Sequence, residues 1–218
     1  MTDVAGLGGG YGDSEPDAAP TVAAVLDAVR PGDREAQLVV ISGPPGVGKS
    51  LLASSLCKTC GTTSIDKDWS AGGFILEASA QVEDGQNAAY DGPRYWKRLR
   101  PLEYAGAMTT ACANLVGRRT VTLTGGWGPE LAIDALWTGL EERLAPTRLV
   151  VLHLDAPTVE IWRQRMAKRG SRSDLPWFGR FAEVVTSHSV WSGAHRLASD
   201  GPPHAILQAA IAAIPAHP

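Results

Sequence analysis

The stretch that decides the fold reads Ser42-Gly43-Pro44-Pro45-Gly46-Val47-Gly48-Lys49-Ser50. It holds the complete phosphate-loop pattern G-x-x-x-x-G-K-[ST], which opens at Gly43 and closes at Ser50. An apolar run, 38–41, precedes the pattern, and a helix-compatible run, 50–56, follows it. A true phosphate loop requires this strand–loop–helix context. The sequence therefore predicts that the chain binds a nucleoside triphosphate.

The residue types of this loop suit a polyphosphate. Glycines let the backbone wrap a phosphate, and successive N–H groups together with a helix N-terminus supply positive potential. We expect Lys49 to reach the β- and γ-phosphates and the Ser50 hydroxyl to ligate Mg²⁺. The alternative is a Gly-Pro turn with an incidental lysine. The predicted nucleotide-binding residues of the loop are Gly43, Pro44, Pro45, Gly46, Val47, Gly48, Lys49, Ser50 and Leu51.

Composition narrows the class of protein. A chain of 218 residues that is 44% hydrophobic can bury one sizeable core, so a single domain is expected. A net charge of -3 argues against a general nucleic-acid or membrane surface. We find no apolar run of the length that a membrane span needs and no basic segment typical of a secretory signal. The three cysteines suit a reducing compartment, so a cytoplasmic protein is expected.

Apolar and helical runs alternate along the chain, which is typical of a parallel sheet with crossover helices. Residues 1–17 are rich in Gly, Asp and Pro and are predicted to be a loosely ordered arm before a domain at 18–218. The expected fold is a five-stranded, three-layer α/β domain with an insertion at 67–100. Strands are predicted at 37–42, 62–66, 120–124, 149–154 and 194–198, and helices at 18–29, 101–116, from 129, 157–170 and 204–214.

Two branches of nucleotide-binding proteins are disfavoured by what the sequence lacks. Guanine-specific switches use an N-K-x-D tetrapeptide, and the chain has none. Motor-like ATPases need an apolar strand that ends in Asp followed by a catalytic Glu. Asp155 ends such a strand, but Ala156 and Pro157 follow it. We interpret Asp155 as the cap of the next helix, with a metal-positioning acid as the alternative. These absences favour a kinase.

A kinase needs a base on the side of the acceptor. Asp66 and Asp68 follow the second predicted strand, which we expect to lie next to the loop strand. On an extended segment, a spacing of two residues points both carboxylates to one face. One can hold Mg²⁺ through water, while the other takes the proton of an acceptor hydroxyl. A polar turn after a strand is the alternative.

The second cluster of charge is an arginine-rich segment, 163–180, after the fourth strand. Arg165, Arg169 and Arg172 follow i, i+4, i+7 spacing, so they share one face if the helix continues. Closing this segment over a triphosphate would neutralise developing charge and exclude water. The sequence therefore predicts a lid, with a solvated basic helix face as the alternative.

Taken in order, these elements resemble the small-molecule P-loop kinases, a group that includes shikimate kinase, gluconate kinase, adenylylsulfate kinase and chloramphenicol phosphotransferase. The resemblance covers about 36–214 and implies ATP and Mg²⁺ as cofactors. It implies that Asp66 helps to hold Mg²⁺ and that Asp68 contacts the acceptor hydroxyl as base. Many relatives carry an acidic or Asp-Gly turn after strand three, whereas this chain reads Thr124-Gly125-Gly126-Trp127. The implied catalytic residues are Lys49, Asp66, Asp68, Arg165 and Arg169; the implied lid contacts to nucleotide are Arg165 and Arg172.

The acceptor side is predicted from the insertion and from tryptophans. The segment 90–100 mixes aromatic side chains with four basic ones, Arg94, Lys97, Arg98 and Arg100, which suggests an anion site. Trp69 and Trp127 follow strands two and three and could line the crevice around a ring-bearing acceptor. The expected reaction is transfer of the γ-phosphate to a hydroxyl of a small molecule, such as a metabolite or antibiotic. The alternatives are a polynucleotide or nucleoside kinase, which net acidity disfavours, and a non-kinase ATPase or nucleotide sensor.

Overall fold

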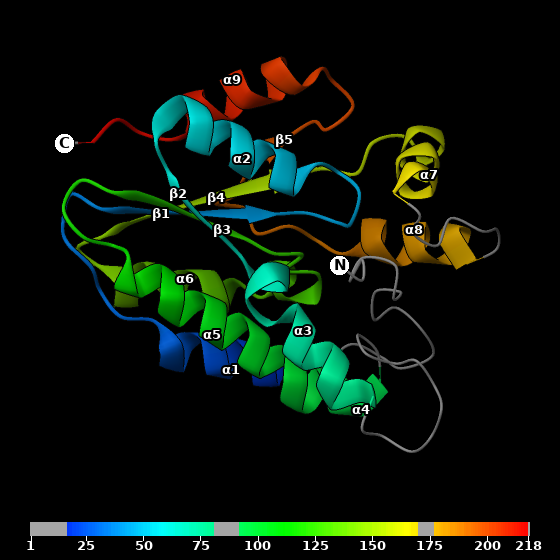
Figure 1. The fold of residues 1–218 in the computed structure, drawn as a ribbon, viewed down its shortest axis with the longest axis horizontal. Coiled ribbons are helices and arrows are strands. Elements are labelled where there is room, and N and C mark those ends of the chain that lie inside the picture. Colours follow the sequence, from blue (N-terminus) through cyan, green and yellow to red (C-terminus); the bar gives the residue numbers. More distant parts are fainter. Residues whose placement is uncertain (1–16, 81–91, 170–176, 218) are drawn as a thin grey trace.

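The computed structural model describes residues 17–80, 92–169 and 177–217 (Figure 1). Its strands form one sheet in the order β2-β3-β1-β4-β5, and every neighbouring pair is parallel. The predicted five-stranded parallel sheet is confirmed, and each strand lies within one residue of its predicted range. The strands are β1 (Gln37–Ser42), β2 (Thr63–Asp66), β3 (Thr120–Thr124), β4 (Arg148–Leu154) and β5 (His195–Leu197).

The order of the strands differs from the prediction at one place. We expected β2 next to the loop strand β1, and this is wrong, because β3 lies between them. Thr124 at the end of β3 pairs with Ile41 on one side and with Asp66 on the other. The connection from β2 to β3 carries several helices, so it is long enough for β3 to return beside β1. Asp66 therefore ends the edge strand of the sheet.

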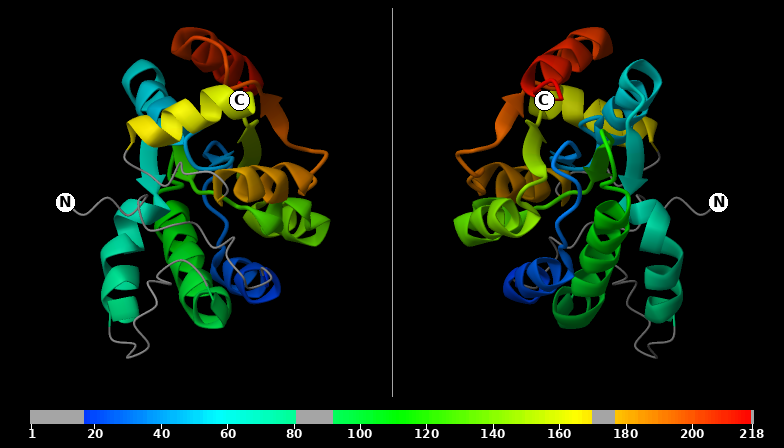
Figure 2. Two further views of the ribbon diagram at one scale, coloured as in Figure 1. Left: turned by 90° about the vertical axis from the view of Figure 1, so that its right-hand side faces the viewer. Right: turned by 90° about the vertical axis from the view of Figure 1, so that its left-hand side faces the viewer.

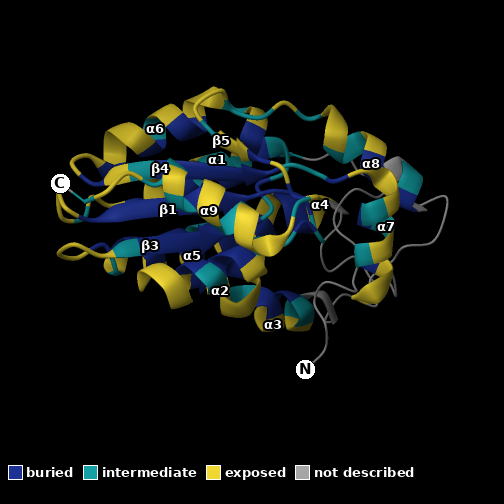
Figure 3. Cartoon of the chain, turned by 90° about the horizontal axis from the view of Figure 1, so that it is seen from above, coloured by how far each residue is buried: buried dark blue, intermediate teal, exposed yellow. Residues whose placement is uncertain are grey.

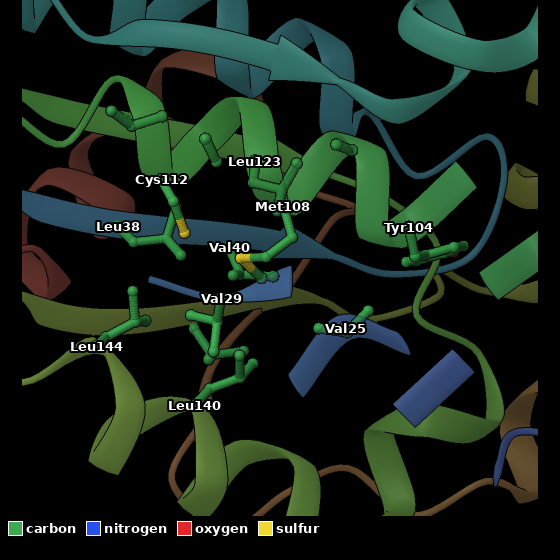
Figure 4. Packing of buried hydrophobic residues seen from close by; sticks show 14 of the residues in the cluster. Val25, Val29, Leu38, Val40, Tyr104, Met108, Cys112, Leu123, Leu140 and Leu144 are labelled. Carbon is green, nitrogen blue, oxygen red and sulfur yellow. The ribbon is translucent and has the colours of Figure 1, made fainter. Parts of the chain in front are cut away.

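Helices cover both faces of the sheet (Figure 1). Side chains alternate along β1, so Leu38 and Val40 join the cluster on one face, and Val39 and Ile41 join the cluster on the other. Figure 4 shows the first cluster from close by. Figure 3 shows the dark blue strands between helices whose outer sides are exposed. The face of the sheet with the first cluster is covered by α1 (Ala19–Ala28), α5 (Arg100–Ala113) and α6 (Asp134–Leu144). The other face is covered by α2 (Lys49–Cys60) and α9 (Pro203–Ala213).

Two helices, α7 (Val159–Lys168) and α8 (Trp177–Ser187), lie beyond the carboxyl ends of the strands (Figure 2). They share a small apolar cluster of their own, which includes Trp162, Met166, Phe178 and Phe181. The cluster is separate from the clusters that cover the sheet, so α7 and α8 pack as one unit. None of the described helices is long and apolar enough to cross a membrane.

The insertion after β2 is more regular than its sequence indicated. Helix α3 (Lys67–Ala80) begins directly after Asp66, and α4 (Gly92–Arg94) and a π-helical turn, η2 (Tyr95–Leu99), precede α5. Ile75 of α3 is buried with Tyr95 and Trp96 in a small cluster. So few apolar contacts leave only a weak periodic signal in the sequence. Residues 81–91 lie outside the described residues.

Several predicted helix ends are wrong. The helix predicted at 101–116 is α5, which ends at Ala113 with Asn114 as its C-cap. The segment after Pro129 is only a 3₁₀ turn, η3 (Pro129–Ala132), before α6. Helix α7 begins at Val159 and is capped by Thr158, whose hydroxyl accepts from the Ile161 N–H at 3.5 Å. The prediction that Asp155 caps this helix is therefore also wrong.

Candidate functional site

The phosphate loop connects β1 to α2 with three glycines in the left-handed region. Gly43, Gly46 and Gly48 have φ of 137°, 82° and 105°, which L side chains rarely adopt. Gly43 also lies against β4, because a Cβ there would be 2.5 Å from the carbonyl oxygen of Leu154. Both glycines of the pattern G-x-x-x-x-G-K-[ST] are therefore required by the backbone conformation. The loop ends at the N-terminus of α2, as predicted.

Lys49 is folded back onto the loop. Its ammonium donates to the carbonyl of Pro44 at 2.8 Å. Burial lowers the pKa of Lys49 to about 8, although the carboxylates of Asp68 and Asp66 act in the opposite direction. A cation held at the cost of desolvation is ready to pair with an anion that enters the loop.

Asp66 connects β2 to the first turn of α2. Its Oδ2 accepts from the Ser50 hydroxyl at 3.1 Å, and its Oδ1 accepts from the backbone N–H of Asp68 at 3.0 Å. The second contact caps α3, so the segment 66–68 turns into a helix. The predicted extended geometry of the pair is therefore wrong, although both carboxylates stay close to the loop. Burial and the nearby Asp68 raise the pKa of Asp66 above its ordinary value.

Asp68 is paired with the neighbouring lysine, which the sequence analysis passed over. The ammonium of Lys67 donates to Asp68 and, at 2.9 Å, to the buried carboxylate of Glu103 in α5. Burial would raise the pKa of Asp68, but Lys67 and, beyond it, Lys49 and Arg100 lower it below its ordinary value. Asp68 is thus held as an anion in a fixed position.

The ion pair of Lys67 belongs to a longer buried network. Glu103 also accepts from the Tyr95 hydroxyl at 3.1 Å, and that hydroxyl accepts from Arg100 at 3.2 Å. Arg100 forms a bidentate pair with Glu130, at 2.8 and 2.7 Å. Arg100 was predicted to contribute to an anion site in the insertion. This is wrong, because its guanidinium is buried and paired with Glu130. No pattern in the sequence marks Glu103 as the partner of Lys67 or Glu130 as the partner of Arg100.

A cavity of about 430 Å³ opens between α2, α7 and α9. We call it the α2–α9 cavity. Arg165 and Arg169 line it, as the prediction of arginines near a nucleotide requires, and Leu51 lines it from α2. Arg172 lies outside the described residues, so the third predicted arginine is not placed. The cavity is lined by Gly46, Val47, Gly48, Leu51, Leu52, Ser55, Leu154, Arg165, Lys168, Arg169, Pro203 and Ile206.

A second cavity, of about 180 Å³, lies on the other side of the phosphate loop, beneath the end of α8. We call it the α8 cavity. Pro44 and Pro45 line it from the loop, and Gly126 lines it from the turn after β3. The phosphate loop therefore separates two cavities. The α8 cavity is completed by Gly43, Gly128, Leu131, His153, Asp155, Ala156, Val185, Thr186, His188, Ser189, Val190 and Arg196.

The floor of the α8 cavity carries a polar cluster that sequence reasoning missed. Burial lowers the pKa of His153 to about 4, so its imidazole is neutral near pH 7. Its Nδ1 lies 3.1 Å from the Ser42 hydroxyl, and its Nε2 lies 3.6 Å from Asp155. Arg196 of β5 donates to the Asp155 carboxylate from Nε at 3.0 Å and from a terminal nitrogen at 2.8 Å. Only Asp155 gave a sequence signal, as an acid at the end of a strand.

Three tryptophans near the predicted acceptor side differ in burial. Trp127 is buried in the main core, where its ring packs edge-on against Tyr104. Trp96 is buried beside Tyr95, and Trp69 is 85% exposed. None of the three is among the described residues that line the two cavities. The prediction that Trp127 lines the crevice is therefore wrong.

Comparison with known proteins agrees with this geometry. The sequence pattern of the ATPase family associated with various cellular activities (AAA) matches residues 39–92, about a quarter of the chain. No curated protein matches the chain in sequence. A gluconokinase from Sinorhizobium meliloti 1021 has a similar fold at 16% identity, with a TM-score of 0.51 over 85% of this chain and 92% of that one. A shikimate kinase from Aquifex aeolicus vf5 is similar at 17% identity, with a TM-score of 0.50 over 81% and 94%. The chain therefore has the P-loop NTPase fold in the form that these small-molecule kinases share.

Proposed function

We propose that the protein is an ATP- and Mg²⁺-dependent phosphotransferase that acts on a hydroxyl group of a small molecule. One observation carries this proposal. Lys49, Ser50, Asp66 and Asp68 converge beside a phosphate loop that separates two cavities. The α2–α9 cavity can take the nucleoside, which would leave the γ-phosphate at the loop beside Asp66 and Asp68, where an acceptor hydroxyl would approach.

The nucleotide part rests on the loop and on the α2–α9 cavity. The loop offers N–H donors at the start of α2, and Lys49 exchanges the Pro44 carbonyl for phosphate oxygens. Arg165 and Arg169 supply further positive charge from α7. A cavity of about 430 Å³ lined by Leu51 and Pro203 suits the apolar faces of a base.

The residues present fit Mg²⁺. The ion prefers a few hard oxygen ligands and keeps several waters. The Ser50 hydroxyl and the Asp66 carboxylate, already 3.1 Å apart, would hold it beside the phosphates. The Thr124 hydroxyl is buried and has no hydrogen-bond partner among the described residues, so it is available to the same site. When bound, the ion neutralises charge on the phosphate oxygens.

Asp68 is our proposed base. As the acceptor oxygen bonds to the γ-phosphorus, its proton passes to the Asp68 carboxylate and the bond to ADP breaks. The lowered pKa of Asp68, caused by Lys67 against the effect of burial, keeps the carboxylate ionised at neutral pH. Lys67 fixes its orientation through Glu103. Asp68 thus receives the proton without first having to lose one.

An acceptor screen by mass spectrometry tests the proposal. The protein is incubated with ATP, Mg²⁺ and a library of sugars, hydroxy acids, nucleosides, antibiotics and short oligonucleotides. We expect one class of small molecules to gain a phosphoryl group as ADP forms. Phosphorylation of oligonucleotide ends alone would favour the polynucleotide alternative. Hydrolysis of ATP without any phosphorylated acceptor would favour the ATPase alternative, to which the AAA match over 39–92 lends weight.

A further inference from the structure

Helix α7 touches the phosphate loop directly. The indole N–H of Trp162 donates to the carbonyl of Pro45 at 2.7 Å, and the Trp162 side chain is fully buried. Met166, one turn further, lies over the next loop residue, because a Cβ at Gly46 would be 2.8 Å from its sulfur. One hydrogen bond and one close packing contact thus hold two successive residues of the loop.

The hydrogen bond fixes the orientation of a whole peptide unit. The bond between Pro45 and Gly46 is trans, and a trans peptide is planar, with its carbonyl and its N–H pointing in opposite directions. Because Trp162 draws the Pro45 carbonyl toward α7, the N–H of Gly46 points away from α7. Within the described part of the chain, this N–H has no backbone partner. It is therefore one of the donors that the loop can offer to a phosphate.

Trp162 is itself held in place before any ligand binds. Its ring packs against Phe178 and Phe181 of α8, with centroid distances of 5.4 and 5.1 Å. The guanidinium of Arg163 lies over the Phe178 ring, 5.2 Å from its centre. Ordering of the indole is thus provided by folding, so that phosphate binding does not have to supply it.

We propose that Trp162 is a positioning residue of the phosphate site, which acts through the Pro45–Gly46 peptide to keep the Gly46 N–H turned toward a bound polyphosphate. The inference rests on the proposed function, since it takes a polyphosphate as the ligand of the loop. It does not depend on the acceptor or on Mg²⁺.

The test compares two conservative variants by calorimetry. Trp162→Phe keeps an aromatic ring but removes the donor to Pro45. Trp137→Phe is the matched control, because the indole of this buried residue also donates to a backbone carbonyl, that of Glu130, at 3.1 Å in the main core. The probes are sodium tripolyphosphate, which needs the loop, and adenosine, which does not. Trp162→Phe should weaken tripolyphosphate binding about 2- to 12-fold, the range for one hydrogen bond, and leave adenosine binding unchanged. Trp137→Phe should change neither affinity.

The outcomes separate the inference from the function on which it rests. Wild-type affinity for tripolyphosphate in Trp162→Phe, or an equal loss for both probes, would overturn the positioning role while the proposed function stands. Failure of the wild-type protein to bind either probe would overturn both. A measurement on the unaltered protein covers the case in which Trp162→Phe does not fold. There, the Gly46 amide proton should move downfield when tripolyphosphate is added, and an unmoved resonance would contradict the inference.

Discussion

The hydroxyl of Ser50 donates to the carboxylate of Asp66 across 3.1 Å, and this contact joins the first turn of α2 to the last residue of β2. Asp66 ends the edge strand β2, and Ser50 lies in the helix that follows the loop strand β1, which β3 separates from β2. In the function proposed above, this hydroxyl and this carboxylate would hold the Mg²⁺ ion.

Asp66→Asn should therefore raise the Mg²⁺ concentration that ATP binding requires. The amide keeps the size of the carboxylate and its acceptor oxygen toward Ser50 but loses the negative charge. Titration of ATP binding against Mg²⁺ for the wild type and the variant measures the shift. Binding of metal-free tripolyphosphate serves as the control and should not weaken. Identical Mg²⁺ curves for the two proteins would remove Asp66 from the metal site.

Asp68→Asn should lower kcat by about 10²–10⁴, the range for a lost general base, with little change in ATP affinity. The variant keeps the shape of the side chain but no longer accepts a proton. Steady-state kinetics with the acceptor found by the screen give kcat, and calorimetry gives the ATP affinity. A variant that lost ATP affinity while keeping kcat would show that Asp68 serves nucleotide binding instead.

Lys49 should make the free energy of unfolding increase as the pH rises from about 8 to 10.5. Burial lowers its pKa to about 8 from an ordinary 10.5, so between these values the folded state binds fewer protons than the unfolded state. The contribution of Lys49 is thus unfavourable below pH 8 and disappears as the pH rises to 10.5. We expect Lys49→Met to be more stable than the wild type at pH 7 by about 1–2 kcal/mol.

Urea unfolding of both proteins from pH 7 to 10 measures this difference, and comparing them cancels the titration of other groups. The difference should shrink toward high pH. A difference that stays constant with pH would mean that Lys49 carries no desolvation penalty. The same Lys49→Met protein should lose several kcal/mol of transition-state stabilisation, because a cation is removed where charge accumulates.

Arg165→Gln and Arg169→Gln should each weaken ATP binding about 3- to 10-fold at low salt, and less at high salt, because both side chains reach solvent and their charges are screened. Lys58→Gln is the matched control, since Lys58 lies exposed in the last turn of α2. Calorimetry at two salt concentrations measures these affinities. An equal loss of ATP affinity in all three variants would mean that the arginines act only through the overall charge of the protein and do not contact the nucleotide.

Lys67→Met should destabilise the fold by about 3–5 kcal/mol, because it leaves the carboxylate of Glu103 buried without its cation. The double variant Lys67→Met/Glu103→Gln should recover most of this loss, since the amide oxygen can still accept from Tyr95. Urea unfolding of the two variants and of Glu103→Gln alone completes the cycle. Additive effects would show that the two side chains do not interact.

The strands and the loop could be predicted from the sequence because their signals are local. Continuous apolar runs mark the central strands β1 and β4, and the glycines of the loop are required by its backbone angles. The order of the strands could not be predicted, because it depends on how the long connection between β2 and β3 folds. Asp66 shows the same limit at the site, since its capping contact with Asp68 turns the chain into α3 where an extended segment was expected.

The second reason why sequence-based predictions of the site failed is that some charged side chains are buried. Arg100 was placed on an anion site because basic residues are mostly exposed, yet Glu130 lies 30 positions away in the chain and pairs with it in the core. Likewise, nothing in the sequence distinguishes Trp162 from the other six tryptophans, and only the fold shows that it contacts Pro45. Contacts between distant positions leave no pattern of spacing, and a single sequence does not reveal them.

The buried pairing of charges also constrains how this protein can change over evolutionary time. Loss of Lys67 leaves the buried Glu103 carboxylate without its cation, and loss of Arg100 or Glu130 leaves the other of that pair buried without its counter-charge. Descendants that replace one partner must therefore replace the other within a few mutational steps. Across a lineage, we expect these four positions to drift in two linked pairs, while the exposed residues of the same helices vary independently.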